Sequence, residues 1–144
     1  MSKVISIHDK VSLEQIEIFE QTNNIKFPML YRDFLLKYNG GRVEPNVFRI
    51  SSEEEESALN VFYGIGDMRN NLQKKFGFYD EILEIGFIPI ASDSGGNQVC
   101  LGMQEEFYDQ IFYWIHDGEY EDAMDNMHFL AKNISVFIDN LYDS

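Results

Sequence analysis

The most informative segment of this chain is Phe27-Pro28-Met29-Leu30-Tyr31-Arg32-Asp33-Phe34-Leu35-Leu36-Lys37-Tyr38-Asn39-Gly40-Gly41. Pro28 suits the first position of a helix, because its missing N–H would be unpaired there in any case. Asn39-Gly40-Gly41 ends the pattern, since only Gly or Asn enters the left-handed cap conformation at little cost. The stretch therefore predicts an amphipathic helix, whose apolar stripe is Leu30, Tyr31, Phe34, Leu35 and Tyr38.

A second helix is expected just upstream, over residues 13–22. Ser12-Leu13-Glu14-Gln15 reads as a capping box, in which the Ser12 hydroxyl and the Gln15 amide satisfy reciprocal backbone donors. Leu13, Ile16 and Phe19 then recur at helical spacing.

The chain downstream of the quoted helix is expected to form mostly strands, with one short helix capped by Asp67 and a closing helix from Asn126 onward. Strands joined by short turns are antiparallel, and grouped elements indicate an α+β fold. We therefore expect one domain over residues 1–144, with a central antiparallel sheet of about five to six strands, N-terminal helices and a C-terminal helix. The expected strands are residues 43–50, 59–65, 87–91, 99–101 and 110–116.

Charge is distributed unevenly along the sequence. Residues 1–75 hold 10 basic and 11 acidic side chains, whereas residues 76–144 hold Lys132 alone against 14 acidic side chains. Such a surface repels phosphate backbones, because nucleic-acid affinity comes largely from Lys and Arg that displace counterions. It should attract a basic protein partner instead.

Three further observations concern the cellular location. The first ten residues contain no apolar core of the length that a signal peptide needs. The longest apolar runs, such as residues 111–115, fall far short of the ~20 residues that span a bilayer. Cys100 is the one cysteine, so no internal disulfide can form. We therefore expect a cytoplasmic protein that does not enter a membrane.

The helix of residues 27–41 is the first of four blocks that together resemble a known family. The others are Phe62-Tyr63-Gly64-Ile65; the hairpin that runs from Ile88-Pro89-Ile90-Ala91 through Asp93 and Gly95-Gly96-Asn97 to Val99-Cys100-Leu101-Gly102; and Tyr113-Trp114 followed by His116-Asp117. In this order and spacing the blocks resemble the SUKH superfamily, which includes the fungal Smi and Knr cell-wall-synthesis regulators and many bacterial immunity proteins. Two positions depart from the family's pattern: Phe27 stands where Leu is usual, and Ile115 interrupts what is often a Trp-Asp-His run.

The resemblance implies an α+β fold without catalytic residues or a cofactor. Bacterial members are typically encoded beside secreted polymorphic toxins, often nucleases, which they bind and block. The first hypothesis is therefore an immunity protein that neutralises a cognate toxin by protein–protein interaction. The alternative is a regulatory or scaffolding protein linked to cell-wall (glucan) synthesis or signalling. An enzyme acting through His116 and nearby carboxylates is the third hypothesis and ranks last.

The partner-binding residues are expected in the second half of the chain. Phe112, Tyr113 and Trp114 are consecutive on a predicted strand, so their side chains alternate between faces and at least one should face outward. Trp114 is the preferred anchor, with core packing as the alternative. The turn at residues 93–97 should close a hairpin and offer a further contact. The full set of expected contact residues is Asp93, Asn97, Trp114, His116, Asp117, Glu119, Glu121 and Asp122.

The remaining motifs have structural interpretations. Cys100 lies between Val99 and Leu101, which predicts a buried core thiol and not a nucleophile. His116 and His128 lack recognisable ligand spacing, so no metal site is expected. Gly64-Ile65-Gly66 lacks the third glycine of a dinucleotide-binding loop, because Arg69 stands at that position.

Overall fold

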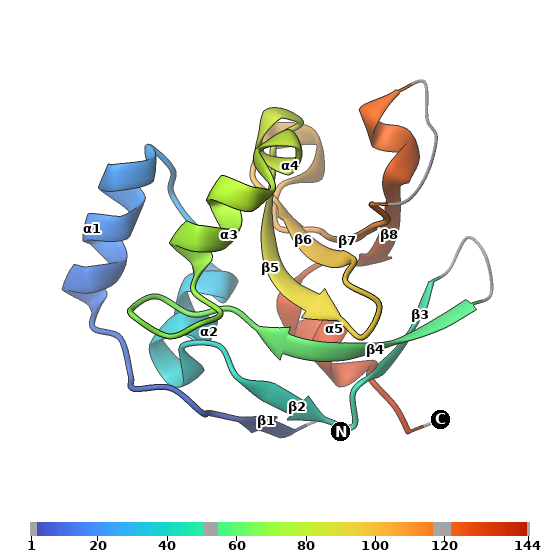
Figure 1. The fold of residues 1–144 in the computed structure, drawn as a ribbon, viewed down its shortest axis with the longest axis horizontal. Helices are drawn as coiled ribbons and strands as arrows, with labels where there is room; N and C mark the ends of the chain where they lie inside the picture. Colours follow the sequence, from blue (N-terminus) through green and yellow to red (C-terminus); the bar gives the residue numbers. More distant parts are fainter. Residues whose placement is uncertain (1–2, 51–54, 117–121, 144) are drawn as a thin grey trace.

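The structure, a computed structural model, describes residues 3–50, 55–116 and 122–143 (Figure 1). Within these ranges the chain forms five α-helices, a six-stranded antiparallel sheet and a two-stranded sheet, which confirms the predicted α+β class. The helices are α1 (Leu13–Asn23), α2 (Met29–Tyr38), α3 (Leu72–Phe78), α4 (Asp80–Glu84) and α5 (Ile134–Asp139), with the 3-10 turns η1 (Glu105–Phe107) and η2 (Ala123–Asn126). The large sheet contains β3 (Val47–Ile50), β4 (Glu55–Phe62), β5 (Phe87–Asp93), β6 (Gln98–Gly102), β7 (Ile111–Trp114) and β8 (Met127–Ala131), and the small sheet pairs β1 (Lys3–Ile5) with β2 (Arg42–Glu44).

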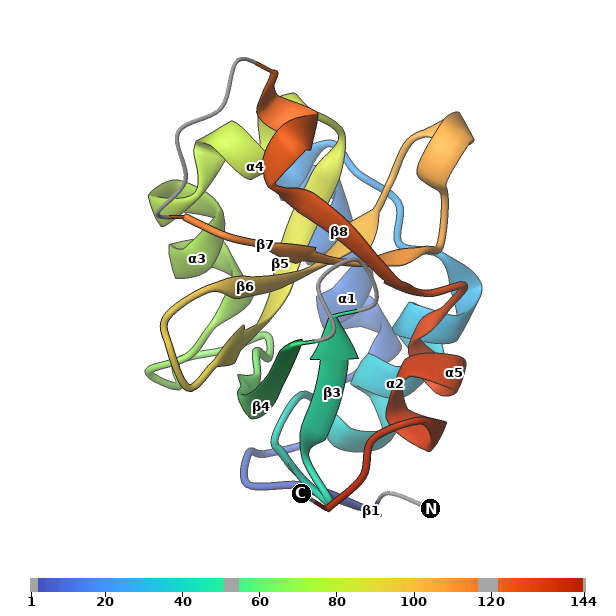
Figure 2. The same ribbon diagram turned by 90° about the vertical axis from the view of Figure 1, so that its right-hand side faces the viewer.

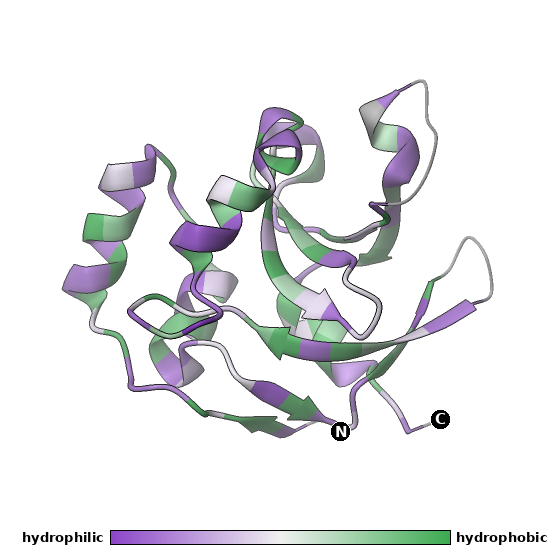
Figure 3. Cartoon of the chain, in the orientation of Figure 1, coloured by the Kyte–Doolittle hydropathy of each residue, from purple (hydrophilic) through white to green (hydrophobic). Residues whose placement is uncertain are grey.

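The large sheet is an antiparallel meander, because each strand from β3 to β8 pairs with the next strand in the chain. The C-terminal residues close off the outer edge of β3, where Val47 and Tyr142 exchange backbone hydrogen bonds of 3.1 and 3.0 Å. β4 changes from hydrophilic to hydrophobic along its length (Figure 3), as its exposed start gives way to buried Val61 and Phe62. The sheet therefore projects β4 into solvent at one end and buries the strand at the other.

Hydrophobic side chains cover both faces of the large sheet. The larger core joins one face to α1, α2, α3 and α5. A smaller core on the other face packs Cys100, Phe112 and Trp114 beneath α4, η1 and η2. Side chains of β7 alternate between the two cores, and all four of its residues are buried. The expectation that one aromatic side chain of this strand faces outward is therefore wrong, because a second layer covers the outer face.

The quoted helix is α2, and the turn that ends it attaches it to the end of β4. Asn39 adopts the left-handed conformation, with φ 50°, and is only 1% exposed. Its Oδ1 accepts the Ile65 N–H at 2.8 Å, while its Nδ2 donates to the carbonyls of Ile65 and Asp9 at 3.0 and 2.9 Å. A Cβ on Gly64 would lie 2.3 Å from the Asn39 carbonyl oxygen, so the close approach requires glycine. The first two sequence blocks thus form one packed unit.

Local signals predicted some elements well and others poorly. α1 begins with the expected capping box, in which Gln15 N–H donates to Ser12 Oγ at 3.1 Å and Ser12 N–H donates to Gln15 Oε1 at 2.9 Å. The helix assigned to an Asp67 cap begins later, because Asn71 is the cap and accepts the Lys74 N–H at 2.8 Å. The strand predicted over residues 43–50 is split into β2 and β3 at Pro45, which has no N–H for a ladder bond.

The closing helix starts eight residues later than predicted from the sequence. Met127–Ala131 is strand β8, paired antiparallel with β7, and the helix begins only after Asn133. Asn133 caps it, because its Oδ1 accepts the Val136 N–H at 2.9 Å. The reason is non-local: β7 needs a second neighbouring strand, and pairing with it overrides the helical spacing of the apolar residues.

Candidate functional site

A buried carboxylate organises the turn between β5 and β6. Asp93 is 4% exposed, and each of its oxygens accepts two hydrogen bonds. Oδ1 accepts the backbone N–H groups of Gly95 and Asn97 at 2.9 and 2.8 Å, which close the turn. Oδ2 accepts the hydroxyls of Ser57, at 2.7 Å, and of Tyr113. This carboxylate therefore connects β4, the turn and β7.

Asn97 continues this network to the end of β7. Its Nδ2 donates to the Tyr113 hydroxyl oxygen at 2.9 Å, so its Oδ1 faces the other way. That oxygen accepts the His116 backbone N–H at 3.0 Å and lies 2.6 Å from His116 Nδ1. Because Asn97 Oδ1 can only accept, His116 Nδ1 carries a proton in this arrangement. The turn thus holds His116, an exposed residue at the strand end, in a defined position.

Tyr113 stays neutral across the physiological range. Its pKa is raised to about 12, first by burial and then by the hydrogen bond that it donates to Asp93. A neutral hydroxyl can donate to Asp93 while it accepts from Asn97. The hydrogen bonds therefore run in series: His116 donates to Asn97, Asn97 donates to Tyr113, and Tyr113 donates to Asp93.

Trp114 is a core residue and not an exposed anchor. It is 5% exposed and belongs to the smaller core, so the sequence-based preference for an exposed tryptophan is wrong and the core-packing alternative is confirmed. Its ring centroid lies 5.7 Å from that of Tyr79 and 6.3 Å from that of His116. Trp114 therefore contacts the half-buried Tyr79 and lies beside the exposed His116.

The short helical segments over the smaller core carry a concentration of acidic side chains. Figures 1 and 2 both place α4, η1 and η2 at the same end of the molecule, which we call the acidic end. No Lys or Arg occurs in the sequence between residues 76 and 131. Asp122 caps η2, where its Oδ1 accepts the Met124 N–H at 3.0 Å. The exposed carboxylates of the acidic end are Asp80, Glu81, Glu84, Glu105, Glu106, Asp122 and Asp125.

The expected contact residues therefore separate into three groups. Asp93 and Trp114 are buried, and Asn97 is half-buried within the turn network. His116 and Asp122 are exposed, on the end of β7 and on the cap of η2. The rest of the expected set, Asp117, Glu119 and Glu121, lies outside the described residues.

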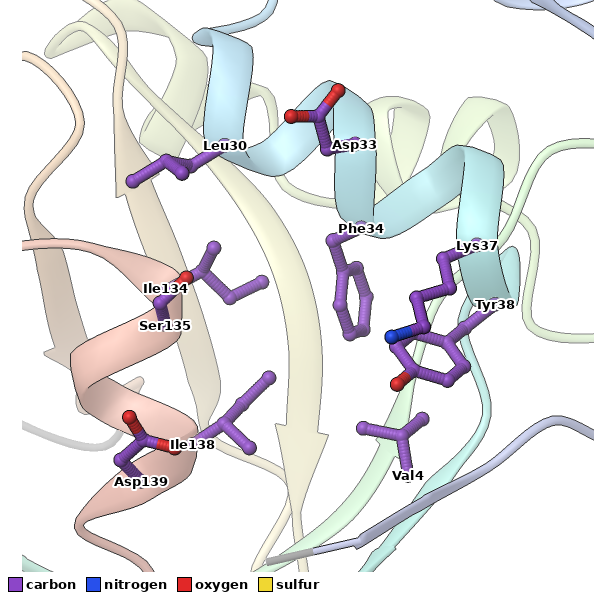
Figure 4. Close-up of a pocket in the computed structure, with 10 residues that line it drawn as sticks. All are labelled: Val4, Leu30, Asp33, Phe34, Lys37, Tyr38, Ile134, Ser135, Ile138 and Asp139. Carbon is purple, nitrogen blue, oxygen red and sulfur yellow. The ribbon is translucent and has the colours of Figure 1, made fainter.

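An apolar groove lies between α2 and α5 (Figure 4). Its volume is about 410 Å³, and Leu30, Phe34, Ile134 and Ile138 point into it from the two helices. No sequence signal indicated the groove, because its two walls are about a hundred residues apart in the chain. Figure 2 shows α2 and α5 on the opposite side of the molecule from the turn between β5 and β6, so the groove is separate from the site around His116.

The remaining features to consider are the single cysteine, possible metal ligands and possible membrane-spanning helices. The Cys100 thiol is fully buried, and burial raises its pKa well above its usual value, which disfavours the reactive thiolate. Among the described residues, no three His, Cys, Asp or Glu side chains are grouped so that they could hold a metal ion. No helix in the described part of the chain has the length and apolar character to cross a membrane.

These features define a class of protein: an α+β domain built on an antiparallel meander, with a hydrogen-bonded turn and an acidic end. The chain belongs to the SMI1 / KNR4 family (SUKH-1), whose family model matches residues 10–140. It is also similar to the SPbeta prophage-derived uncharacterized protein YokK of Bacillus subtilis (strain 168), with 26% identity over 147 residues. That match covers 90% of this chain and 74% of the Bacillus protein. The sequence-based resemblance to SUKH proteins is thus confirmed.

The Asn97 side chain can be tested by its removal. We expect Asn97→Ala to lower the free energy of unfolding by about 1.5 kcal/mol, because the His116 N–H and the Tyr113 hydroxyl each lose a partner. Urea unfolding measures this change, and hydrogen exchange should show faster exchange of the His116 amide. Ser94→Ala in the same turn is the control, since Ser94 is exposed and should change stability by less than about 0.5 kcal/mol. Unchanged exchange at His116 in Asn97→Ala would contradict this role.

Proposed function

We propose that this protein is an immunity protein that binds a basic domain of a cognate toxin and blocks it. The observation that carries the proposal is the acidic end, where exposed carboxylates gather over α4, η1 and η2 without a Lys or Arg between residues 76 and 131. Charge complementarity speeds association with a basic partner and disfavours wrong partners. Membership of the SMI1 / KNR4 family (SUKH-1) agrees with this role, since the SUKH superfamily includes bacterial immunity proteins.

The inhibition needs only occupancy of the toxin surface. The network from Asp93 through Tyr113 and Asn97 fixes His116, from which the chain continues toward Asp117. A surface held in place before binding loses less conformational entropy when it binds. The protein would cover a basic active-site surface and exclude its substrate, and this action requires neither a cofactor nor a catalytic residue.

Rescue from toxicity is the experiment that tests the proposal. The toxin domain encoded next to this gene is expressed in a bacterial host with and without this protein, and growth is measured. We expect restored growth, and co-purification that weakens as ionic strength rises, because salt screens charge attraction. Failure of both rescue and binding would sink the immunity proposal.

Charge reversal localises the contact. We expect the triple variant Glu119→Lys, Glu121→Lys and Asp122→Lys to weaken binding of the toxin domain by at least ~10-fold, since attraction becomes repulsion. The control makes the same change in net charge in α1 and α2, at the exposed Glu14, Glu17 and Asp33. Calorimetric titration gives both dissociation constants. Equal weakening by the two triple variants would exclude residues 119–122 as the contact and leave only the overall charge.

A regulatory or scaffolding role is the second candidate, because the matching family model bears the names of SMI1 and KNR4. The gene neighbourhood distinguishes the two functions. An adjacent toxin gene favours immunity, whereas its absence favours an unlinked partner in cell-wall synthesis or signalling.

A further inference from the structure

A cluster of cations stands beside the acidic end. Arg69 precedes α3, and Lys74 and Lys75 lie in it, within a chain whose net charge is −14. None of the three forms an ion pair with any described residue, whereas Arg32 pairs with Glu20 at 2.8 Å. The pKa of Lys75 is lowered, first by burial and then by repulsion from Lys74 and Arg69. The three charges therefore share one patch and have no neutralising carboxylate within salt-bridge distance among the described residues.

Two aromatic rings give this patch a defined shape. The Lys75 Nζ lies 5.1 Å from the ring centroid of Tyr63 and 5.8 Å from that of Phe78. Tyr63 is buried, and its hydroxyl donates to Gln98 Oε1 at 2.5 Å, which holds the ring in place. Phe78 is 63% exposed, which is unusual for so large an apolar side chain. Lys75 therefore contacts both the ring of buried Tyr63 and the ring of exposed Phe78.

The patch is continuous with the site described above. α3 ends at Phe78 and α4 begins at Asp80, so only Tyr79 separates the helix that carries Lys74 and Lys75 from the helix that carries the first carboxylates of the acidic end. Tyr79 contacts Trp114, whose ring lies beside His116. In Figure 2, α3 and the turn between β5 and β6 lie on the same side of the molecule, below α4. A partner seated on His116 and the acidic end would also face α3.

We propose that Arg69, Lys74, Lys75 and Phe78 form a second contact with the toxin domain, which meets them with carboxylates around an apolar depression that receives Phe78. This inference rests on the proposed immunity function and names a further feature of its partner. Neighbouring patches of opposite charge fix the register of a complex, because any shifted arrangement brings like charges together. An aromatic side chain flanked by cations is a typical interface anchor. A nucleic acid fits this surface poorly, since the adjoining carboxylates repel phosphates.

The test is calorimetric titration of the toxin domain encoded beside the gene with purified variants of the full chain. We expect Phe78→Ala to weaken binding by about 30-fold, as for an anchor residue at an interface. The double variant Arg69→Glu and Lys74→Glu should weaken it by at least ~10-fold. Both variants change exposed side chains, so their thermal unfolding should match that of the wild type.

The controls separate a local contact from overall charge. Lys37→Glu with Lys132→Glu makes the same change in net charge at exposed positions in α2 and before α5, away from α3. Ile18→Ala removes another exposed apolar side chain, which is 55% exposed on α1. If only the overall charge of the chain determines binding, the two double variants should bind a basic partner with the same affinity. Neither should then bind it more weakly than the wild type does. That result, or unchanged binding by Phe78→Ala, would overturn the second contact while wild-type binding still supports immunity. Absence of wild-type binding would overturn both.

Discussion

Replacing Asp93 by alanine should lower the free energy of unfolding by about 4 kcal/mol. The carboxylate accepts four hydrogen bonds, and its removal leaves the Tyr113 hydroxyl and the Gly95 N–H without this acceptor. A donor that loses its partner in a buried site retains its desolvation penalty, which costs about 1–3 kcal/mol for each group. The loss is less than the sum over four bonds, because the exposed tip of the turn can rearrange to reach water.

Chemical unfolding in urea measures this change, and Asp139→Ala is the matched control. Asp139 is an exposed carboxylate at the end of α5, so its removal should change stability by less than about 0.5 kcal/mol. Asp93→Asn should fall between the two, because the amide keeps one acceptor oxygen but presents an NH₂ group to neighbouring donors. A loss below about 1 kcal/mol for Asp93→Ala would show that the turn network does not stabilise the fold.

The features that could be predicted from the sequence are those with local causes. α1 has its capping box, and α2 has Pro28 before it and Asn39 after it, so each boundary is encoded within a few residues. The antiparallel hairpin of β5 and β6 is likewise encoded by the turn between them. Such signals identified the α+β class before any long-range contact was known.

The errors have non-local causes. Residues 127–131 carry apolar side chains that fit a helix, and only their pairing with β7 makes them a strand. The alternation along β7 was anticipated, but not the short segments α4, η1 and η2 that bury Phe112 and Trp114 on the outer face. The alternating pattern of a strand predicts that its side chains lie on two faces. It does not predict which segments of the chain cover the outer face.

The same distinction applies to the candidate site. Asp93 and Asn97 belong to one recognisable turn, so the sequence identified them. The partners that give them their roles are Ser57, which is 36 residues from Asp93, and His116, which is 19 residues from Asn97. In the sequence, the cations of α3 belong to the first half of the chain, whose basic and acidic side chains nearly balance. Their importance comes from the fold, which sets α3 beside the acidic end.

Asn39→Ala is expected to have an effect of similar size to that of Asp93→Ala, about 4 kcal/mol, for a different reason. The substitution removes three hydrogen bonds to the backbone of Ile65 and Asp9, and it places alanine in the left-handed region at φ 50°. Asn24→Ala provides a close control, because Asn24 ends α1 with φ 53° but is exposed. It should lose only the conformational preference, about 1 kcal/mol.

The difference between the two asparagine variants therefore measures the hydrogen bonds that attach α2 to the end of β4. Urea unfolding of both proteins should give a difference of about 3 kcal/mol. Equal losses would mean that the left-handed backbone alone requires asparagine, and that the Ile65 backbone finds other partners. A large difference would explain physically why Asn39-Gly40-Gly41 and Gly64-Ile65 occur together in the sequence, since Asn39 is the residue through which the two segments are joined.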